Sequence, residues 1–155
     1  MFHIIVQFHS EKNDFIPREA LVTQWAKSAL RHKVRRGELT IRFVAKKEIR
    51  ALNKRYRHQD KATNVLSFKA DLPPGMSRKV PLLGDIIICP TVVNAEARKL
   101  IQAGAGDQEA HWAHIVIHGV LHILGYDHQT EREAHQMENK EIRLLHRLGF
   151  ENPYL

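Results

Sequence analysis

The sequence contains little cysteine and no long apolar run, and both absences narrow the class of protein. Its single cysteine, Cys89, excludes an intrachain disulfide. No stretch approaches the roughly 18 apolar residues of a membrane-spanning helix. The N-terminal residues also lack the basic segment and long apolar core of a signal peptide. We therefore expect a soluble protein of a reducing cytoplasm, with no membrane partner.

Acidic residues are outnumbered in this chain. There are 24 Lys and Arg against 17 Asp and Glu, which gives a net charge of +7. Such an excess favours an anionic partner, of which nucleic acid is the commonest, although a merely solvated basic surface is the alternative. The 155 residues are enough to bury a core without disulfides or other cross-links. We expect one domain spanning residues 1–155.

Hydrophobic periodicity predicts an α+β fold, with a small mixed four-stranded sheet packed with about five helices. The predicted strands span residues 2–8, 38–45, 63–69 and 82–89, and the predicted helices span residues 17–33, 46–56, 90–103, 108–124 and 130–147. The proline-rich stretch at 71–81 should be an irregular, exposed loop. Helical connections indicate parallel relations among the first three strands, whereas the last two strands could pair antiparallel.

A histidine pattern at the end of the fourth predicted helix is typical of a single-ion metal site. His118 and His122 are four residues apart, so on a helix both imidazoles can reach one ion. Gly125 can take the left-handed conformation that ends a helix, and the reversal could bring His128 to the same ion. Three nitrogen ligands leave one position open for water, as in catalytic zinc sites. A histidine-rich helix with packed or exposed rings is the alternative.

Other side chains could take part in this site. His114 and His122 are about 12 Å apart along the helix axis, so His114 is better suited to support a ligand or contact substrate, or it is only a packed or surface ring. Asp127 could bind the metal or orient a ligand histidine. Asp85 lies in an otherwise apolar strand and needs a partner, either a structural one or the metal site.

The spacing resembles that of the metzincin metalloproteases, but one residue departs from their pattern. Those enzymes carry a glutamate general base after the first histidine, where this chain has Gly119. The base would then be a metal-bound hydroxide, a substrate group or a residue elsewhere. An RNA phosphodiester suits the basic charge better, with the helix at 46–57 holding the backbone. Arg57, at the end of that helix, is our candidate for binding phosphate oxygens and stabilising transition-state charge.

Four blocks of this sequence resemble the YbeY family of bacterial rRNA-maturation endoribonucleases. They are ELTIRFV at 38–44, LNKRYRHQDKATNVLSF at 52–68, LGDIII at 83–88 and HGVLHILGYDH at 118–128. The resemblance implies a zinc-dependent, single-strand-specific endoribonuclease that acts in 16S rRNA 3′-end maturation and ribosome quality control. It also implies a small mixed sheet with a zinc-bearing, zincin-like helix.

The same resemblance implies site residues and partners. One zinc ion would be bound by His118, His122 and His128, and Arg57 would be the catalytic arginine. The partners would be single-stranded RNA, in particular rRNA, together with the small ribosomal subunit and a ribosome-assembly GTPase. The first alternative is a ribosome-assembly factor that binds RNA and whose metal is structural. A metalloprotease is the second and less favoured alternative.

Overall fold

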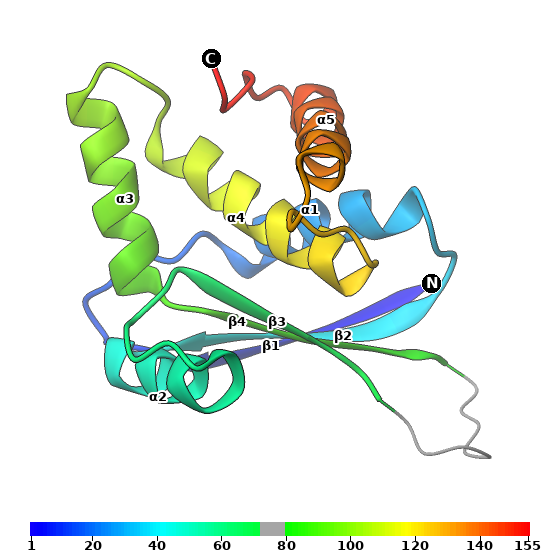
Figure 1. The fold of residues 1–155 in the computed structure, drawn as a ribbon, viewed down its shortest axis with the longest axis horizontal. Coiled ribbons are helices and arrows are strands. Elements are labelled where there is room, and N and C mark those ends of the chain that lie inside the picture. The colour runs from blue at the N-terminus through cyan, green and yellow to red at the C-terminus, as the bar shows by residue number, and fades with distance from the viewer. Residues whose placement is uncertain (72–79) are drawn as a thin grey trace.

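The computed structural model describes residues 1–71 and 80–155 (Figure 1). In chain order its elements are β1 (Phe2–His9), α1 (Glu19–Arg31), β2 (Gly37–Val44), α2 (Lys46–Arg57), β3 (Val65–Lys69), β4 (Leu82–Ile88), α3 (Pro90–Gln102), α4 (Gln108–Ile123) and α5 (Glu131–Arg147). The predicted α+β class is confirmed, and every predicted strand and helix has a counterpart. Most of the predicted loop at 71–81, including Pro73, Pro74 and Gly75, lies outside the described residues. Among the helices described, none has the length and apolar character to cross a bilayer.

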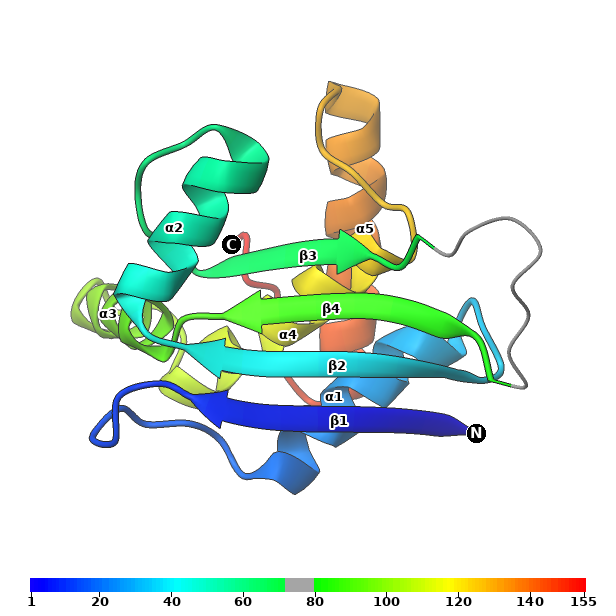
Figure 2. The ribbon, with the colours of Figure 1, turned by 90° about the horizontal axis from the view of Figure 1, so that it is seen from below.

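The four strands form one mixed sheet in the order β1-β2-β4-β3 (Figure 2). β1 and β4 both run parallel to β2, and β3 runs antiparallel to β4. The predicted antiparallel last pair is confirmed, but the predicted parallel relation of β3 to β2 is wrong. Figure 2 shows the reason: α2 stays near the end of the sheet at which β2 finishes. Because α2 does not carry the chain back along the sheet, β3 starts from that same end and runs in the opposite direction.

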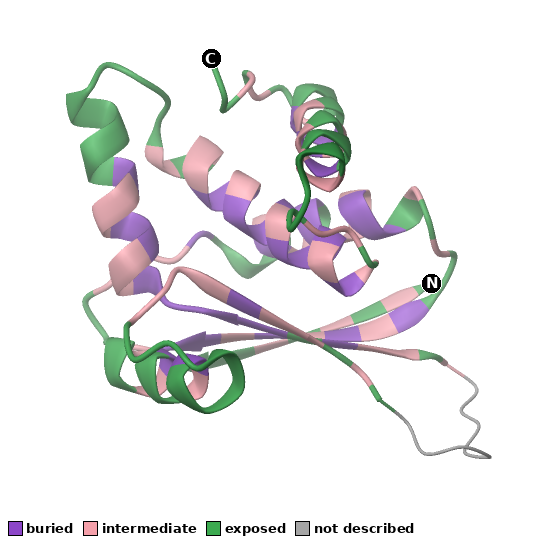
Figure 3. Cartoon of the chain, viewed as in Figure 1, coloured by how far each residue is buried: buried purple, intermediate pink, exposed green. Residues whose placement is uncertain are grey.

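Helices α1, α4 and α5 lie on one side of the sheet and α2 lies on the other (Figure 1). Alternation along the strands sends one set of apolar side chains toward α4, and Figure 3 shows buried residues along the interface between α4 and the sheet. The main core includes Trp25, Trp112, Leu39, Ile41, Phe43, Ile86 and Ile88. A smaller cluster involving α2 contains Val44, Ile49, Leu66, Ile87 and Cys89.

The β3–β4 pair contains one glycine whose conformation and surroundings both exclude a side chain. Gly84 has φ +153°, and a Cβ atom there would collide with the carbonyl oxygen of Phe68 and lie 2.8 Å from Cδ1 of Ile123. Ile123 is part of α4, so this position lets the sheet and the end of the histidine helix come close together.

We expect Gly84→Ala to destabilise the protein by more than Gly104→Ala. Both glycines have positive φ, but nothing lies within 4 Å of a Cβ at Gly104. The control should lose about 1–2 kcal/mol for backbone conformation alone, whereas Gly84→Ala should lose a further 1–3 kcal/mol, roughly, for overpacking. Urea denaturation of both variants measures the difference. Equal losses would contradict the packing described for Gly84.

Candidate metal centre and active site

Helix α4 is capped at both ends. Asp107 accepts a hydrogen bond from the backbone N–H of Ala110 at 2.7 Å, as an N-cap does. At the other end Gly125 has φ +102°, and the backbone N–H of Tyr126 donates to the carbonyl of Leu121 at 3.0 Å. This left-handed ending reverses the chain immediately before His128, as the glycine predicted.

The reversal brings the three predicted histidines together. The ring centroids of His118 and His122 are 4.6 Å apart, and His128 lies 5.1 Å from His122 and 5.9 Å from His118. One nitrogen from each ring lies within 4.8 Å of the other two. The Nε2 atoms of His118 and His122 are separated by 3.1 Å. Since zinc–nitrogen bonds of about 2.0–2.1 Å place tetrahedral ligands about 3.3 Å apart, the three rings could hold one ion.

The protonation of His122 also suits a metal ligand. Burial lowers the pKa of His122, and the neighbouring His118 and His128 lower it further, to about 4. The ring is therefore neutral near pH 7, which is the form that binds a metal.

A buried carboxylate from another helix contacts this cluster. Glu141 of α5 is 1% exposed. Its Oε2 accepts hydrogen bonds from Nε2 of His114 at 2.7 Å and from Nδ1 of His118 at 3.1 Å. The hydroxyl of Tyr154 donates to its Oε1 at 2.7 Å. His114 therefore lies beside the three-histidine cluster, bound to Glu141, and does not join it.

The electrostatics of this contact favour an ionised Glu141. Burial alone would raise the pKa of the carboxyl group, but the hydrogen bonds from His114 and His118 outweigh it and hold the pKa at about 2. Burial and the same carboxylate raise the pKa of Tyr154, so the phenol remains a hydrogen-bond donor. Our sequence analysis missed Glu141. The available signal was its position on the apolar stripe of α5, between Met137 and Leu144.

The two aspartates considered from the sequence have other surroundings. Asp127 accepts a hydrogen bond from the backbone N–H of His128 at 2.8 Å, so it supports the local backbone of that residue. Asp85 is exposed and lines a groove with Gln7, Thr40 and Arg42. It lies on the opposite face of the sheet from α4, because alternation places it opposite Ile86. Because Asp85 is exposed, its carboxylate does not need the buried partner that we expected, and it does not join the histidine cluster.

Arg57 is connected to the histidine helix through β3. Its Nη2 donates to the carbonyl of Ser67 at 2.9 Å, and its guanidinium group lies 4.9 Å from the centre of the Phe68 ring. The hydroxyl of Ser67 in turn donates to the carbonyl of Gly119 at 2.8 Å. Two hydrogen bonds therefore connect the end of α2 to the residue that follows His118.

Gly119 is the position at which metzincins carry their glutamate, and here it packs closely against the sheet. A Cβ atom at Gly119 would lie 3.0 Å from Cγ2 of Ile86, 3.3 Å from Cγ2 of Val65 and 3.4 Å from Oγ of Ser67. A longer side chain would push α4 away from the sheet. The packing thus disfavours a glutamate at this position, and the glycine itself supplies no general base.

Fold and site define the class: a small α+β protein with a candidate three-histidine metal centre on a glycine-terminated helix. The family model of endoribonuclease YbeY matches residues 6–149. The chain is 48% identical to an endoribonuclease YbeY of Nitrosococcus oceani, covering 90% of this chain and 88% of that one. It is 51% identical to one of Pseudomonas entomophila, covering 89% and 85% respectively. The chain belongs to the endoribonuclease YbeY family.

A solved structure shares the fold. The solution structure of a Thermotoga maritima protein matches with a TM-score of 0.56 at 26% identity, over 94% of this chain and 87% of that one.

We expect His128→Ala to abolish most zinc binding without destabilising the metal-free protein, because this side chain is exposed. Loss of a residue that only hydrogen-bonds to a metal ligand weakens metal binding by about 10–100-fold. Loss of a direct ligand should weaken zinc binding by more than this. Added zinc should raise the melting temperature of the wild type and much less that of the variant.

His135→Ala is the matched control, since His135 is also exposed but lies on α5 outside the cluster. This control should retain the full zinc-dependent shift. An equal shift in His128→Ala would remove His128 from the ligand set.

Proposed function

We propose that residues 1–155 form one zinc-dependent domain that cleaves single-stranded RNA, with a single zinc ion bound by His118, His122 and His128. The chain is a nuclease by family, and so a hydrolase of phosphodiester bonds. The observation that carries the proposal is the pairing of an open three-histidine cluster with Arg57, through Ser67.

The chemistry follows from the groups that surround the cluster. When bound, the zinc ion supplies a Lewis acid that activates water and polarises a phosphoryl oxygen. Arg57 uses one N–H for the carbonyl of Ser67 and one for that of Tyr56. A guanidinium group has five N–H donors, so the others can bind the oxygens of a phosphate. Arg57 would thus position the scissile phosphate and stabilise the charge that develops on it.

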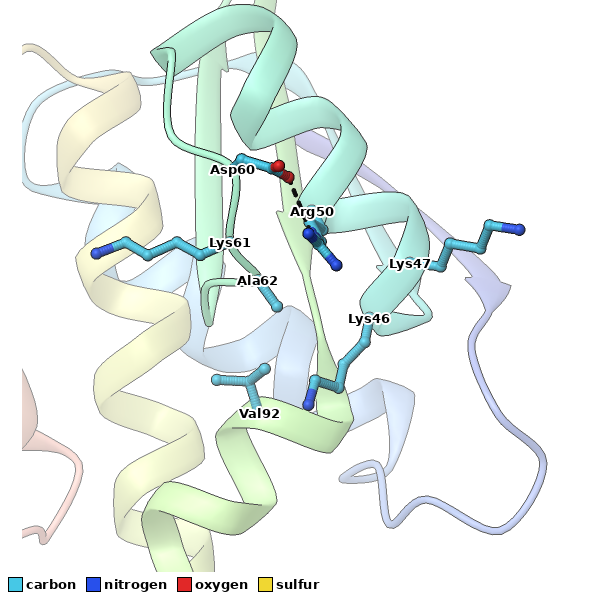
Figure 4. A pocket seen from close by; sticks show the side chains of 7 residues that line it. All are labelled: Lys46, Lys47, Arg50, Asp60, Lys61, Ala62 and Val92. Carbon is cyan, nitrogen blue, oxygen red and sulfur yellow. Dashed lines mark hydrogen bonds and ion pairs between the residues drawn. The ribbon is translucent and has the colours of Figure 1, made fainter.

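A track for the RNA backbone follows α2. Figure 4 shows a shallow pocket between α2, the segment after it and the start of α3. It is lined by Lys46, Lys47, Arg50, Asp60, Lys61, Ala62 and Val92. Asp60 pairs with Arg50 at 2.8 Å, and the three lysines leave this region positively charged. The residues of α2 from Lys46 to Arg57 span about 16 Å, which suits several phosphates in succession.

The biological setting that we propose rests on the family resemblance. In it the substrate is rRNA, the cleavage matures the 3′ end of 16S rRNA, and the enzyme acts in ribosome biogenesis and quality control. Contacts with the small ribosomal subunit and a ribosome-assembly GTPase in the cytoplasm belong to the same proposal.

We expect Arg57→Ala to retain one equivalent of zinc and to lose about 10²–10³-fold in the rate of single-stranded RNA cleavage. Arg57→Lys should recover only part of the loss, because an ammonium group cannot bind two phosphate oxygens in the same plane. Metal content is measured by mass spectrometry. The cleavage rate is measured with a labelled single-stranded RNA.

The matched control is Arg98→Ala, which removes an exposed arginine from α3. It should cleave RNA at the wild-type rate. Equal cleavage by wild type and Arg57→Ala, or cleavage by neither at full zinc content, would favour a binding factor whose metal is structural.

We expect RNA affinity to fall steeply with salt, with a slope that depends on α2. Replacing Lys46 and Lys47 by glutamine should reduce the logarithmic salt slope by about 0.7 for each lost phosphate contact on a single strand. The double variant Arg98→Gln/Lys99→Gln, on the exposed surface of α3, should keep the wild-type slope. Fluorescence anisotropy between 50 and 300 mM salt, roughly, measures the slope. Identical slopes in all three proteins would exclude the α2 track.

A further inference from the structure

We propose that Glu141 is the positioning residue of this metal centre: its carboxylate accepts the Nδ1–H of His118 and thereby presents the Nε2 lone pair of that ring to the ion. The inference rests on the proposed zinc site and deepens it. It adds a residue from α5, outside the HGVLHILGYDH motif.

The hydrogen bond between Glu141 and His118 determines which nitrogen of the ring carries the hydrogen. An ionised carboxylate can only accept hydrogen bonds, so every polar group that faces it must donate. Oε2 of Glu141 faces Nδ1 of His118 at 3.1 Å, which places the hydrogen of the neutral ring on Nδ1. The remaining lone pair is then on Nε2, the atom that lies 3.1 Å from Nε2 of His122. The contact with Glu141 therefore selects the tautomer that the three-histidine site requires.

Glu141 is buried in a position where an apolar residue would be expected. Within residues 1–71 and 80–155, Glu141 is the only buried acidic residue. It lies on the apolar stripe of α5, between Met137 and Leu144, where a leucine would pack without any polar partner. A buried carboxylate is tolerated when its lone pairs are used. Here the donors are His114 and His118 of α4 and Tyr154 of the C-terminal segment, so two of its three hydrogen bonds are with the histidine helix.

Tyr154 fixes the orientation of that carboxylate. Its hydroxyl donates to Oε1 at 2.7 Å, while His114 and His118 donate to Oε2. With both oxygens engaged, the carboxylate group cannot rotate without breaking a hydrogen bond. This gives His114 and Tyr154 a common role, since both hold Glu141 in the orientation that His118 needs.

The same atoms could instead bind a second ion, because ligand atoms of His114, His118 and Glu141 lie within 4.8 Å of one another. His118 would then bridge two metals and would have to lose both ring hydrogens, which is unfavourable for an imidazole at neutral pH. Zinc stoichiometry distinguishes the two arrangements.

The first test compares zinc affinity in the full-length wild type, Glu141→Gln and the control Glu131→Gln. Glu131 is exposed on the same helix, so the control loses the same charge without touching the cluster. Competition with a chromophoric chelator should show about 10–100-fold weaker zinc binding in Glu141→Gln. Glu131→Gln should match the wild type.

The second test needs no variant and stands even if Glu141→Gln does not fold. Two-dimensional nitrogen NMR of the histidine rings in metal-free wild type, recorded at a pH where the rings are neutral, should show the hydrogen of His118 on Nδ1 and its lone pair on Nε2. A zinc-bound ring with the metal on Nε2 carries its hydrogen on Nδ1 in any case, so it is the tautomer of the metal-free ring that reports the contact with Glu141; a hydrogen on Nε2 of the metal-free ring would overturn the inference.

The outcomes separate this inference from the proposed function. One equivalent of zinc in the wild type, with weakened binding in Glu141→Gln and a hydrogen on Nδ1 of the metal-free His118 ring, supports the inference. Unchanged affinity in a folded Glu141→Gln, or a hydrogen on Nε2 of the metal-free His118 ring, overturns it while leaving the zinc site intact. Two equivalents in the wild type, one of them lost in Glu141→Gln, also overturn it and make Glu141 a ligand. No zinc in the wild type overturns the proposed function itself.

Discussion

The close approach of α4 to the sheet at Gly119 is the contact on which the candidate site depends. Without a Cβ at this position, the helix lies directly against Ile86 and the hydroxyl of Ser67 reaches the carbonyl of Gly119. His118 is the preceding residue, so this contact sets the height and rotation of the first ring relative to β3. A bulkier residue at Gly119 would push α4 away from the sheet and so shift His118 and His122 relative to β3.

Three distant segments of the chain meet around α4, and the mixed topology explains how. β3 is an edge strand, and an edge strand has outward carbonyls that need partners from outside the sheet. Arg57, at the end of α2, provides one for Ser67 in the middle of β3. On the other side of α4, α5 brings Glu141 to His118. Glu141 thus contacts His118 directly, and Arg57 is connected through Ser67 to the next residue, Gly119.

Local patterns in the sequence predict the elements and the histidine cluster, but they do not predict contacts between segments far apart. The four-residue spacing of His118 and His122, and the reversal at Gly125, depend only on the geometry of one helix. The direction of β3 depends on the path that α2 takes, which periodicity does not contain. Glu141 belongs to no local sequence motif, and only its position on the apolar stripe of α5 indicates that it is buried.

The position of charge, more than the three histidines, favours an anionic substrate. A peptidase built on this spacing uses a carboxylate next to the first ligand, whereas this chain has Gly119 there, packed closely against Ile86 and Val65. The carboxylate that does contact the cluster, Glu141, is buried behind His118 and bound to three donors, so it is not free to accept a proton from water. Arg57 is exposed and is connected to the histidine helix through Ser67. At the end of that helix, Nζ of the exposed Lys33 donates to the carbonyl of Leu124. The exposed cations of Arg57 and Lys33 favour a phosphodiester, which carries its own negative charge and gains more as it is cleaved.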